Sequence, residues 1–413
     1  MIVSSWAPPM VGGPQNLYNL FSQFTPDSYC VFTTSEAINQ RQVTGSKLAG
    51  EYLFFDAPAS NRSDSRPEDR HMQVSGGRIQ RVATLARGAV AIAYHTTYHT
   101  CKTIVTIIRM VRIGIRLVHE KKVDCLLGIS DVGPALISTY LISRIAGIPY
   151  ALYLFDIYQG NILSPMNRFL AKIFERRLFR RASMVIVTNE GTERFYRKRY
   201  GGIFKSAVVH NSIFLSDYEH YRTPYSPREP YVIVFTGSVY WAQERSLMNL
   251  VRALDEMADP RIRLDLYVHN ADSKLREQLG SRSYVRLMAA PQSDMARVQC
   301  SATLLFLPLS WHTGAPEIIA TATPGKLVDY LASGRPILIH APPYTYLNEY
   351  AKENSFAAVV DEENVGKLKA AIRRLLSDLE VSLRLIENAK TTLTANHDAH
   401  LNARKLATIL ESV

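Results

Sequence analysis

Short apolar runs alternate with segments of helical periodicity along most of the 413-residue chain. In the first half, the runs that predict buried strands are Ile2–Ser5, Val123–Ile129, Tyr150–Phe155 and Met184–Thr188. The segments that predict helices are Gln15–Phe24, Thr103–Lys122, Pro134–Ala146 and Asn167–Arg181. Strands that alternate with helices in this way indicate a parallel sheet with helices on its faces.

The same alternation begins again after residue 230. Its predicted strands are Tyr231–Phe235, Leu264–Val268, Val285–Leu287, Leu304–Pro308 and Ile337–Ile339. Its predicted helices are Arg245–Met257, Gly325–Ala332 and a helical region from about residue 365 to the last residue. Residues 215–230 are polar and contain three prolines, which is typical of a linker. We therefore predict two doubly wound domains, residues 1–220 and 221–413, and the C-terminal helix could pack back on the first.

The composition fits a globular protein, with 47% hydrophobic and 21% charged residues. The four cysteines are far apart in the sequence, which argues against a disulfide framework and favours a reducing cytoplasm. The most apolar stretch, residues 134–158, contains Arg144, Gly147 and Pro149, so a helix followed by a buried strand explains it better than a membrane span. The polar residues 57–80 indicate a loop.

The net charge of +11 belongs to the first half of the chain. Residues 1–230 hold 28 Lys and Arg against 17 Asp and Glu, whereas residues 231–413 hold 20 of each. The excess indicates an anionic partner for the first half or simply a basic, solvated surface, and both readings stay open. Two basic segments, 102–122 and 167–181, pair arginines with an apolar stripe, so either an anionic membrane surface or a packed core could face them. Nothing resembles a nucleic-acid-binding module.

The segment TPGKLVDYLASGRPIL, residues 323–338, carries the clearest chemistry. Pro324 and Gly325 predict the start of a helix, and Lys326 and Asp329 fall one turn apart near that start. A lysine beside a helix start suits phosphate oxygens, and a nearby carboxylate suits ribose hydroxyls. A solvated Lys and Asp on an ordinary connection is the alternative.

The run PGKLVDYLASGRPIL resembles the P-S-K-L-x-E-Y-x-A-x-G-x-P signature of the retaining glycosyltransferase family 4, which has the GT-B fold. Four more segments resemble that family in the same order along the chain. They are the turn at Met10–Gln15, RASMVIVTNEG at 181–191, AVVHNSIF at 207–214, and VFTGSVYWAQERSLMNLVRAL at 234–254. The resemblance implies two facing Rossmann-like domains around a cleft, with a sugar nucleotide bound chiefly by the second.

The resemblance also implies roles for single residues. Arg245 and Lys326 would counter the charge of the donor diphosphate, and Asp156 would face the transferred sugar; these are the expected catalytic residues. The expected donor-binding residues are Gly12, Gly13, Gly237, Ser238, Pro324, Gly325 and Asp329. No metal site and no cofactor are expected, since none of the 17 aspartates has another two positions away to hold a diphosphate through Mg²⁺.

Three positions depart from the family pattern. Thr321 stands where the first acid of an E-x7-E element would fall, and Glu317 is the nearest acid, out of register. Ser238 replaces the usual arginine after the glycine of the turn. Phe155 precedes Asp156 where many members have a histidine. The donor sugar and the full catalytic set therefore stay open, including whether Glu317 replaces the missing acid.

The expected reaction is transfer of a sugar, with retention, from a nucleoside diphosphate to an acceptor hydroxyl. The expected acceptor is a glycan or a polyprenyl-linked intermediate of cell-surface polysaccharide synthesis. The protein would lie in the cytoplasm, free or peripheral on the inner face of the membrane. A GT-B-fold sugar-nucleotide epimerase and a non-catalytic nucleotide-sugar-binding protein are the alternatives.

Overall fold

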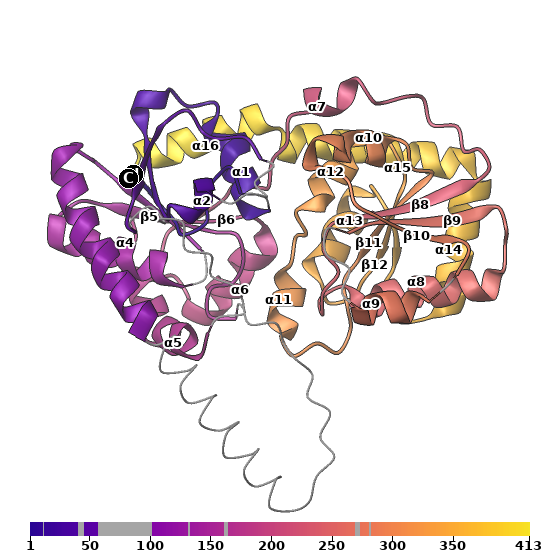
Figure 1. Cartoon of the computed structure of the whole chain (residues 1–413), viewed down its shortest axis with the longest axis horizontal. Helices are drawn as coiled ribbons and strands as arrows, with labels where there is room; N and C mark the ends of the chain where they lie inside the picture. Colours follow the sequence, from indigo (N-terminus) through magenta and orange to yellow (C-terminus); the bar gives the residue numbers. More distant parts are fainter. Residues whose placement is uncertain are drawn as a thin grey trace, which may run out of the picture.

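The computed structural model describes residues 1–10, 12–39, 45–56, 101–130, 133–160, 164–268, 273–280 and 282–413. Two parallel sheets form the centres of two α/β bodies that lie side by side (Figure 1). The doubly wound architecture predicted from the sequence is confirmed.

The first sheet has seven parallel strands in the order β3-β2-β1-β4-β5-β6-β7. Their bounds are β1 Ile2–Val3, β2 Cys30–Thr33, β3 Glu51–Phe54, β4 Leu126–Ile129, β5 Tyr150–Leu154, β6 Met184–Val187 and β7 Ser206–Val208. The helices are α1 Gly13–Phe21, α2 Glu36–Asn39, the helical residues 101–120, α4 Pro134–Ala146, α5 Pro165–Arg181 and α6 Glu190–Tyr200. The order of the strands reverses between β1 and β4, and ligands of open parallel sheets bind at the carboxyl ends of strands at such a point.

Side chains alternate between the two faces of this sheet. Leu152 and Leu154 of β5 pack in a core with residues 101–120, α4, α5 and α6, whereas Tyr153 packs in the other core with α1. This period of two is what a strand buried on both faces requires.

The second sheet has six parallel strands in the order β10-β9-β8-β11-β12-β13. Their bounds are β8 Tyr231–Thr236, β9 Ile262–Tyr267, β10 Val285–Met288, β11 Leu304–Pro308, β12 Ile337–His340 and β13 Ala358–Val360. Helices α8 Glu244–Met257, α9 Ser273–Leu279 and α14 Val365–Ser377 cover one face. On the other face lie α10 Met295–Cys300, α11 Pro316–Thr321, α12 Lys326–Ala332 and α13 Tyr346–Asn354.

Two segments connect the bodies. The chain passes from β7 through α7, Ser216–Glu219, and an irregular linker to β8. After α15, Leu379–Thr392, and a π-helical turn at Leu393–His397, α16, Ala399–Glu411, returns to the first body beside α1 (Figure 1). Leu406 of α16 is completely buried in the core of that body.

Four strands escaped the sequence analysis: β2, β3, β7 and β13. Three of them, β3, β7 and β13, lie at sheet edges. An edge strand is buried less fully, and β7 has intermediate burial at all three positions, so its apolar signal is weak. The first strand also ends at Val3, two residues before its predicted end.

The apolar stripe of α5, which either a membrane surface or a packed core could face, packs only in part against the core. The structure buries Asn167, Ala171 and Glu175 of this helix together with Leu178 and Phe179, and leaves Phe169 and Ile173 exposed. A carboxylate can occupy the buried position 175 because Tyr196 and Tyr200 of α6 donate hydrogen bonds to it.

The stripe predicted for residues 102–122 is correct in part. Ile107 and Val118 are buried, whereas Ile104 and Ile108 face outward. None of the helices in the described part of the chain has both the length and the apolar character needed to cross a bilayer.

Candidate functional site

The carboxyl end of β8 brings a glycine turn against a lysine from another element. Gly237 follows β8 with φ of +107°, a conformation that L side chains rarely adopt, and its N–H donates to the carbonyl of Tyr267 at 2.9 Å. A Cβ at Gly237 would lie 3.2 Å from Nζ of Lys326. Glycine therefore allows the backbone and the lysine to approach each other closely.

The ammonium group of Lys326 is buried and has no hydrogen-bond partner. Its Nζ lies 3.8 Å from the ring centroid of Phe235, so a cation–π contact replaces hydrogen bonds. Burial lowers the pKa of Lys326 to about 7, and the nearby charge of Asp329 opposes only part of this effect. A buried amine without a partner is energetically unfavourable unless a ligand pairs with it.

Asp329 lies in a polar network beneath β8. Its Oδ1 is 3.0 Å from the hydroxyl of Tyr218, which is also 2.7 Å from Oε1 of Gln299. The amide of Gln299 donates in turn to the hydroxyl of Thr236 at 3.1 Å. Burial raises the pKa of Asp329 to about 6, although Tyr218 and Lys326 oppose the shift. The structure thus places Lys326 and Asp329 near each other. The ring of Phe235 contacts the lysine, and the hydroxyl of Tyr218 contacts the aspartate.

The first body contributes a facing set of residues. Gly12 precedes α1 with φ of +88°, and a Cβ at Gly13 would lie 3.1 Å from the ring of Phe155. Asp156 follows that ring after β5 and is exposed. Protein nevertheless surrounds its carboxylate, and this burial raises the pKa of Asp156. The first glycine turn therefore lies beside the segment that carries Asp156.

Asp156 faces the loop that follows β8. Burial raises the pKa of Tyr240, a residue of that loop, and the negative charge of Asp156 adds to the shift. Asp156 of the first body and Tyr240 of the second therefore lie near each other.

A cavity of about 920 Å³ opens beside this cleft. Gln159, Gly160 and Arg168 line it from the first body, and Trp241, Arg245 and residues 311–318 are among those that line it from the second. Neither Lys326 nor Asp329 lines it. A volume of this size lies in the range of about 300–1,000 Å³ that is usual for ligand sites.

Arg245 is already paired with a carboxylate. Its guanidinium donates to both oxygens of Glu363, at 3.1 Å for the Nη2 contact, and its backbone N–H donates to Ser310 at 3.2 Å. This pairing raises the pKa of Arg245 and lowers that of Glu363. The structure therefore does not place Arg245 and Lys326 in one pocket, and the role of Arg245 on the diphosphate stays a prediction.

Thr321 does not present its hydroxyl to the cleft. The hydroxyl donates to the carbonyl of Glu317 at 2.9 Å, within α11, and the Thr321 carbonyl accepts from Asn189 at 3.1 Å. Glu317, one turn earlier, lines the cavity, and a Cβ at Gly160 would lie 3.8 Å from its Oε2. Whether Glu317 replaces the missing acid stays a prediction.

The remaining expected donor residues surround Lys326 at the surface. Ser238 and Gly325 are exposed, and the carbonyl of Pro324 accepts from the N–H of Leu327 at 2.8 Å. Helix α12 starts at Lys326, one residue later than predicted. The sequence analysis missed Tyr218, which reaches Asp329 from more than a hundred residues earlier in the chain.

Polar contacts also join the two bodies behind the cleft. Glu190 of α6 accepts from the hydroxyl of Tyr346 of α13, and His210 lies 3.2 Å from the same carboxylate. Arg194 donates to both oxygens of Glu349 at 2.6 and 2.7 Å. Burial alone would raise the pKa of Glu190, but His210 and the hydroxyl of Tyr346 lower it to about 2. The carboxylate is therefore ionised at neutral pH.

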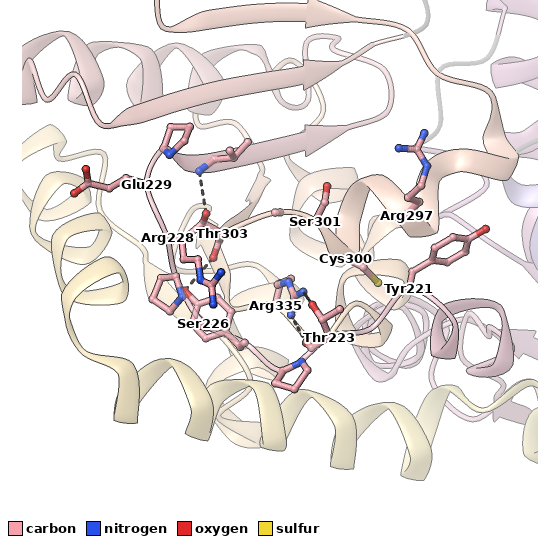
Figure 2. Close-up of a pocket in the computed structure, with 16 residues that line it drawn as sticks. Tyr221, Thr223, Ser226, Arg228, Glu229, Arg297, Cys300, Ser301, Thr303 and Arg335 are labelled. Carbon is pink, nitrogen blue, oxygen red and sulfur yellow. Dashed lines mark hydrogen bonds between the residues drawn. The ribbon is translucent and has the colours of Figure 1, made fainter.

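A second cavity, of about 630 Å³, lies under the linker at the amino ends of the strands of the second sheet (Figure 2). Arg335 is buried there and donates to the carbonyl and hydroxyl of Thr223 at 2.9 and 2.8 Å, and to the carbonyl of Gly334. These contacts fix the linker to the domain. Oxygen acceptors of the protein already engage this cation, in contrast to Lys326.

The described residues contain no group of three or more His, Cys, Asp and Glu side chains that could hold a metal ion. His95 and His99, a pair with the spacing of metal ligands on a helix, lie outside the described residues.

Residues 230–378 match the family model described as Glycosyl transferases group 1. No curated protein matches the chain by sequence. Among solved structures, Anabaena HepE in complex with UDP and glucose superposes with a TM-score of 0.67 at 14% identity, covering 100% of this chain and 99% of that chain. Sucrose-phosphate synthase from Thermosynechococcus elongatus gives 0.65 at 13% identity, with 99% and 97% covered.

WaaG, a glycosyltransferase involved in lipopolysaccharide biosynthesis, gives a TM-score of 0.60 at 14% identity, with 99% of this chain and 98% of that chain covered. At this identity the likeness shows the fold alone, and that fold is GT-B. The match to the glycosyl transferases group 1 model lies within the second body and includes Gly237, Lys326 and Asp329.

Proposed function

We propose that this protein is a glycosyltransferase that takes a sugar from a nucleoside diphosphate and transfers it, with retention, to an acceptor hydroxyl. The observation that carries the proposal is the buried, unpartnered ammonium of Lys326 beside the Gly237 turn, inside the group 1 domain. A diphosphate would give that ammonium its missing partners. HepE, which has the same fold, was solved with UDP-glucose.

In this proposal the protein supplies position and charge to the reaction. Lys326 pairs with the diphosphate and stabilises the negative charge that grows on it as the sugar leaves. Asp329 accepts hydrogen bonds from the ribose, since its second oxygen is not engaged by Tyr218. Gly12 and Gly13 let the first domain approach the donor, and Asp156 faces the sugar. The departing diphosphate takes the proton of the acceptor on the same face of the sugar, which explains retention.

Nucleotide binding is the first test of the proposal. A bound nucleotide stabilises the folded state by mass action, so one sugar nucleotide among UDP, GDP and ADP sugars should raise the melting temperature. The variant Lys326→Met keeps the apolar stem of the side chain and should abolish that rise. Lys352→Met, a change at an exposed lysine paired with Asp361, is the matched control and should leave it intact. If no sugar nucleotide binds the wild type, the proposal is wrong.

The acceptor in this proposal is attached to a lipid. Ile104, Val105 and Ile108 on residues 101–120, and Phe169 and Ile173 on α5, are exposed apolar side chains of the first domain. Exposed arginines accompany them on both helices: Arg109, Arg112 and Arg116, then Arg168, Arg176, Arg177, Arg180 and Arg181. Apolar and basic side chains together favour binding to the surface of an anionic bilayer, where a lipid-linked intermediate of surface polysaccharide synthesis would be available.

Vesicle flotation tests this surface. The wild type should float with phosphatidylglycerol vesicles and not with phosphatidylcholine vesicles, and the double change Ile108→Glu and Phe169→Glu should prevent flotation. Leu383→Glu, on an exposed leucine of the second domain, is the control. Equal flotation of all variants would contradict the membrane assignment without touching the transferase reaction.

Two observations favour a second candidate, a nucleotide-sugar-binding protein without catalysis. Thr321 turns its hydroxyl into α11, and the exposed Ser238 carries no charge. This candidate predicts a sugar nucleotide that binds but is neither transferred nor hydrolysed over hours. Release of free nucleoside diphosphate from the bound donor would exclude it.

A further inference from the structure

Backbone amides of the loop that carries Asp156 donate hydrogen bonds to side chains of neighbouring helices. Two consecutive amides of residues 156–160 donate hydrogen bonds inward: Tyr158 N–H to the hydroxyl of Tyr196 at 2.7 Å, and Gln159 N–H to Oε1 of Glu175 at 3.0 Å. The hydroxyl of Tyr196 donates to the same Oε1 at 3.2 Å. Both amides are therefore tied, directly or through one tyrosine, to a single carboxylate.

Glu175 is completely buried on the inner side of α5. Its second oxygen accepts from the hydroxyl of Tyr200, and Nε of Arg199 lies 3.9 Å from it. Burial raises the pKa of Glu175, and the surrounding hydrogen bonds and the charge of Arg199 oppose that shift. The Gln159 amide and the hydroxyls of Tyr196 and Tyr200 all donate to the carboxylate, so both of its oxygens act as acceptors.

Packing alone does not explain a carboxylate at this position. A buried ion contributes little to stability compared with an apolar residue of similar size, because removing it from water is costly. Phe179 and Tyr196, whose ring centroids are 4.5 Å apart, already pack α5 against α6. What Glu175 adds is acceptors for backbone amides, which no apolar side chain provides.

We propose that Glu175 is a positioning residue that fixes the loop 156–160 on the wall of the cleft. It contacts no substrate and acts through the loop. One end of the loop carries Asp156, whose charge influences Tyr240, and the other end presents Gln159 and Gly160 to the cavity of about 920 Å³. Its kinetic consequence rests on the proposed glycosyl transfer, whereas the anchoring of the loop does not.

Three variants separate positioning from a merely structural role. Glu175→Gln keeps an oxygen that can accept from Gln159 and Tyr196, and Glu175→Met fills the site without an acceptor. Tyr196→Phe removes the hydroxyl that accepts from the Tyr158 amide and leaves Glu175 in place. This variant keeps the proposal testable if the Met variant does not fold. Glu193→Gln is the matched control, because Glu193 also lies on α6 but accepts from Arg197 and Ser206 rather than from the loop.

Amide hydrogen exchange on the whole chain is the first readout. The amide of Gln159 should exchange about tenfold faster in the Met variant and that of Tyr158 about tenfold faster in Tyr196→Phe, the effect of losing one hydrogen bond. Amides of β6 should be unchanged in both variants, and Glu175→Gln and Glu193→Gln should resemble the wild type. Unchanged loop exchange in both Met and Phe variants would overturn the proposal, whether or not the protein transfers sugar.

Steady-state kinetics with the nucleotide sugar that binds is the second readout. Misplacing Asp156 should lower kcat by about tenfold or more in the Met variant while KM for the donor changes little, since the second domain holds the nucleotide. Glu175→Gln should restore kcat. A Gln variant as slow as the Met variant, or a folded Met variant with wild-type kcat, would overturn the positioning role and leave the transferase proposal standing.

Discussion

Lys326 should take up a proton when a nucleoside diphosphate sugar binds. Its pKa is about 7 in the free protein because the ammonium is buried without partners. A diphosphate beside it favours the charged form and should return the pKa to about 10 or higher, the ordinary range for lysine. The diphosphate of a sugar nucleotide has no proton to exchange near neutral pH, so the lysine is the source of the effect.

The magnitude follows from these two pKa values. At pH 7 about half of the protein molecules must acquire a proton on binding, and at pH 8 about nine in ten must. Affinity should therefore fall by about tenfold for each pH unit above 7, which is about 1.4 kcal/mol per unit. Below pH 6 the lysine is already charged, so its contribution to the pH dependence should end, while Asp329, with a pKa of about 6, becomes protonated.

Titration calorimetry in two buffers of different ionisation enthalpy measures this uptake directly. The slope of observed enthalpy against buffer enthalpy at pH 8 should correspond to about 0.9 proton in the wild type. Lys326→Arg stays charged at every pH and should bind without uptake. Asp329→Asn should keep the uptake, because it leaves the lysine in place. Tight binding with no proton uptake in the wild type would refute the pairing of Lys326 with the diphosphate.

Three further perturbations follow from other parts of the structure. Gly237→Ala places a side chain at φ of +107° and 3.2 Å from Lys326, so denaturant unfolding should show a loss of about 1–3 kcal/mol together with weaker nucleotide binding. Leu406→Ala empties a fully buried position where α16 meets the first domain and should lower the free energy of unfolding by about 2–5 kcal/mol, whereas Leu401→Ala on the exposed side of α16 should not. Burial and the nearby His210 lower the pKa of His397 to about 3, against about 6.5 in the unfolded chain. The unfolded chain therefore binds the extra proton, and the free energy of unfolding should fall as the pH drops from about 6.5 to 3. His397→Gln should reduce the slope of this fall by up to about 1.4 kcal/mol per pH unit.

The architecture could be predicted from the sequence because buried parallel strands are continuous apolar runs. Helix α4 was predicted with its observed bounds, since Pro134 marks its start and Gly147, with φ of +72°, ends it. The edge strands were missed because only part of each is buried. The apolar pattern of α5 did not reveal that Glu175 is buried, for a different reason. Residues 16 to 25 positions away stabilise this carboxylate, and a helical period does not encode such contacts.

The sequence could indicate which residues form the candidate site, but not which side chains contact them. Lys326, Asp329 and Gly237 stand in short sequence signatures, and the structure brings all three to the end of β8. The ring of Phe235 under the ammonium and the hydroxyl of Tyr218 on the carboxylate could not be predicted, because tertiary packing alone brings them there. Burial within the fold is the main cause of the pKa shifts of Lys326 and Asp329, so the pH dependence of the site required the structure.

The two expected cations of the site are kept in opposite states. Lys326 has no partner and a lowered pKa, so it acquires its full charge only when an anion arrives. Arg245 keeps its charge at every pH but is neutralised by Glu363, and an incoming anion must compete with that carboxylate. Pairing with Glu363 offsets the charge of Arg245, whereas the uncharged form of Lys326 lowers the cost of burying an amine without a partner. Any contact between Arg245 and a donor diphosphate would therefore require the arginine to leave Glu363.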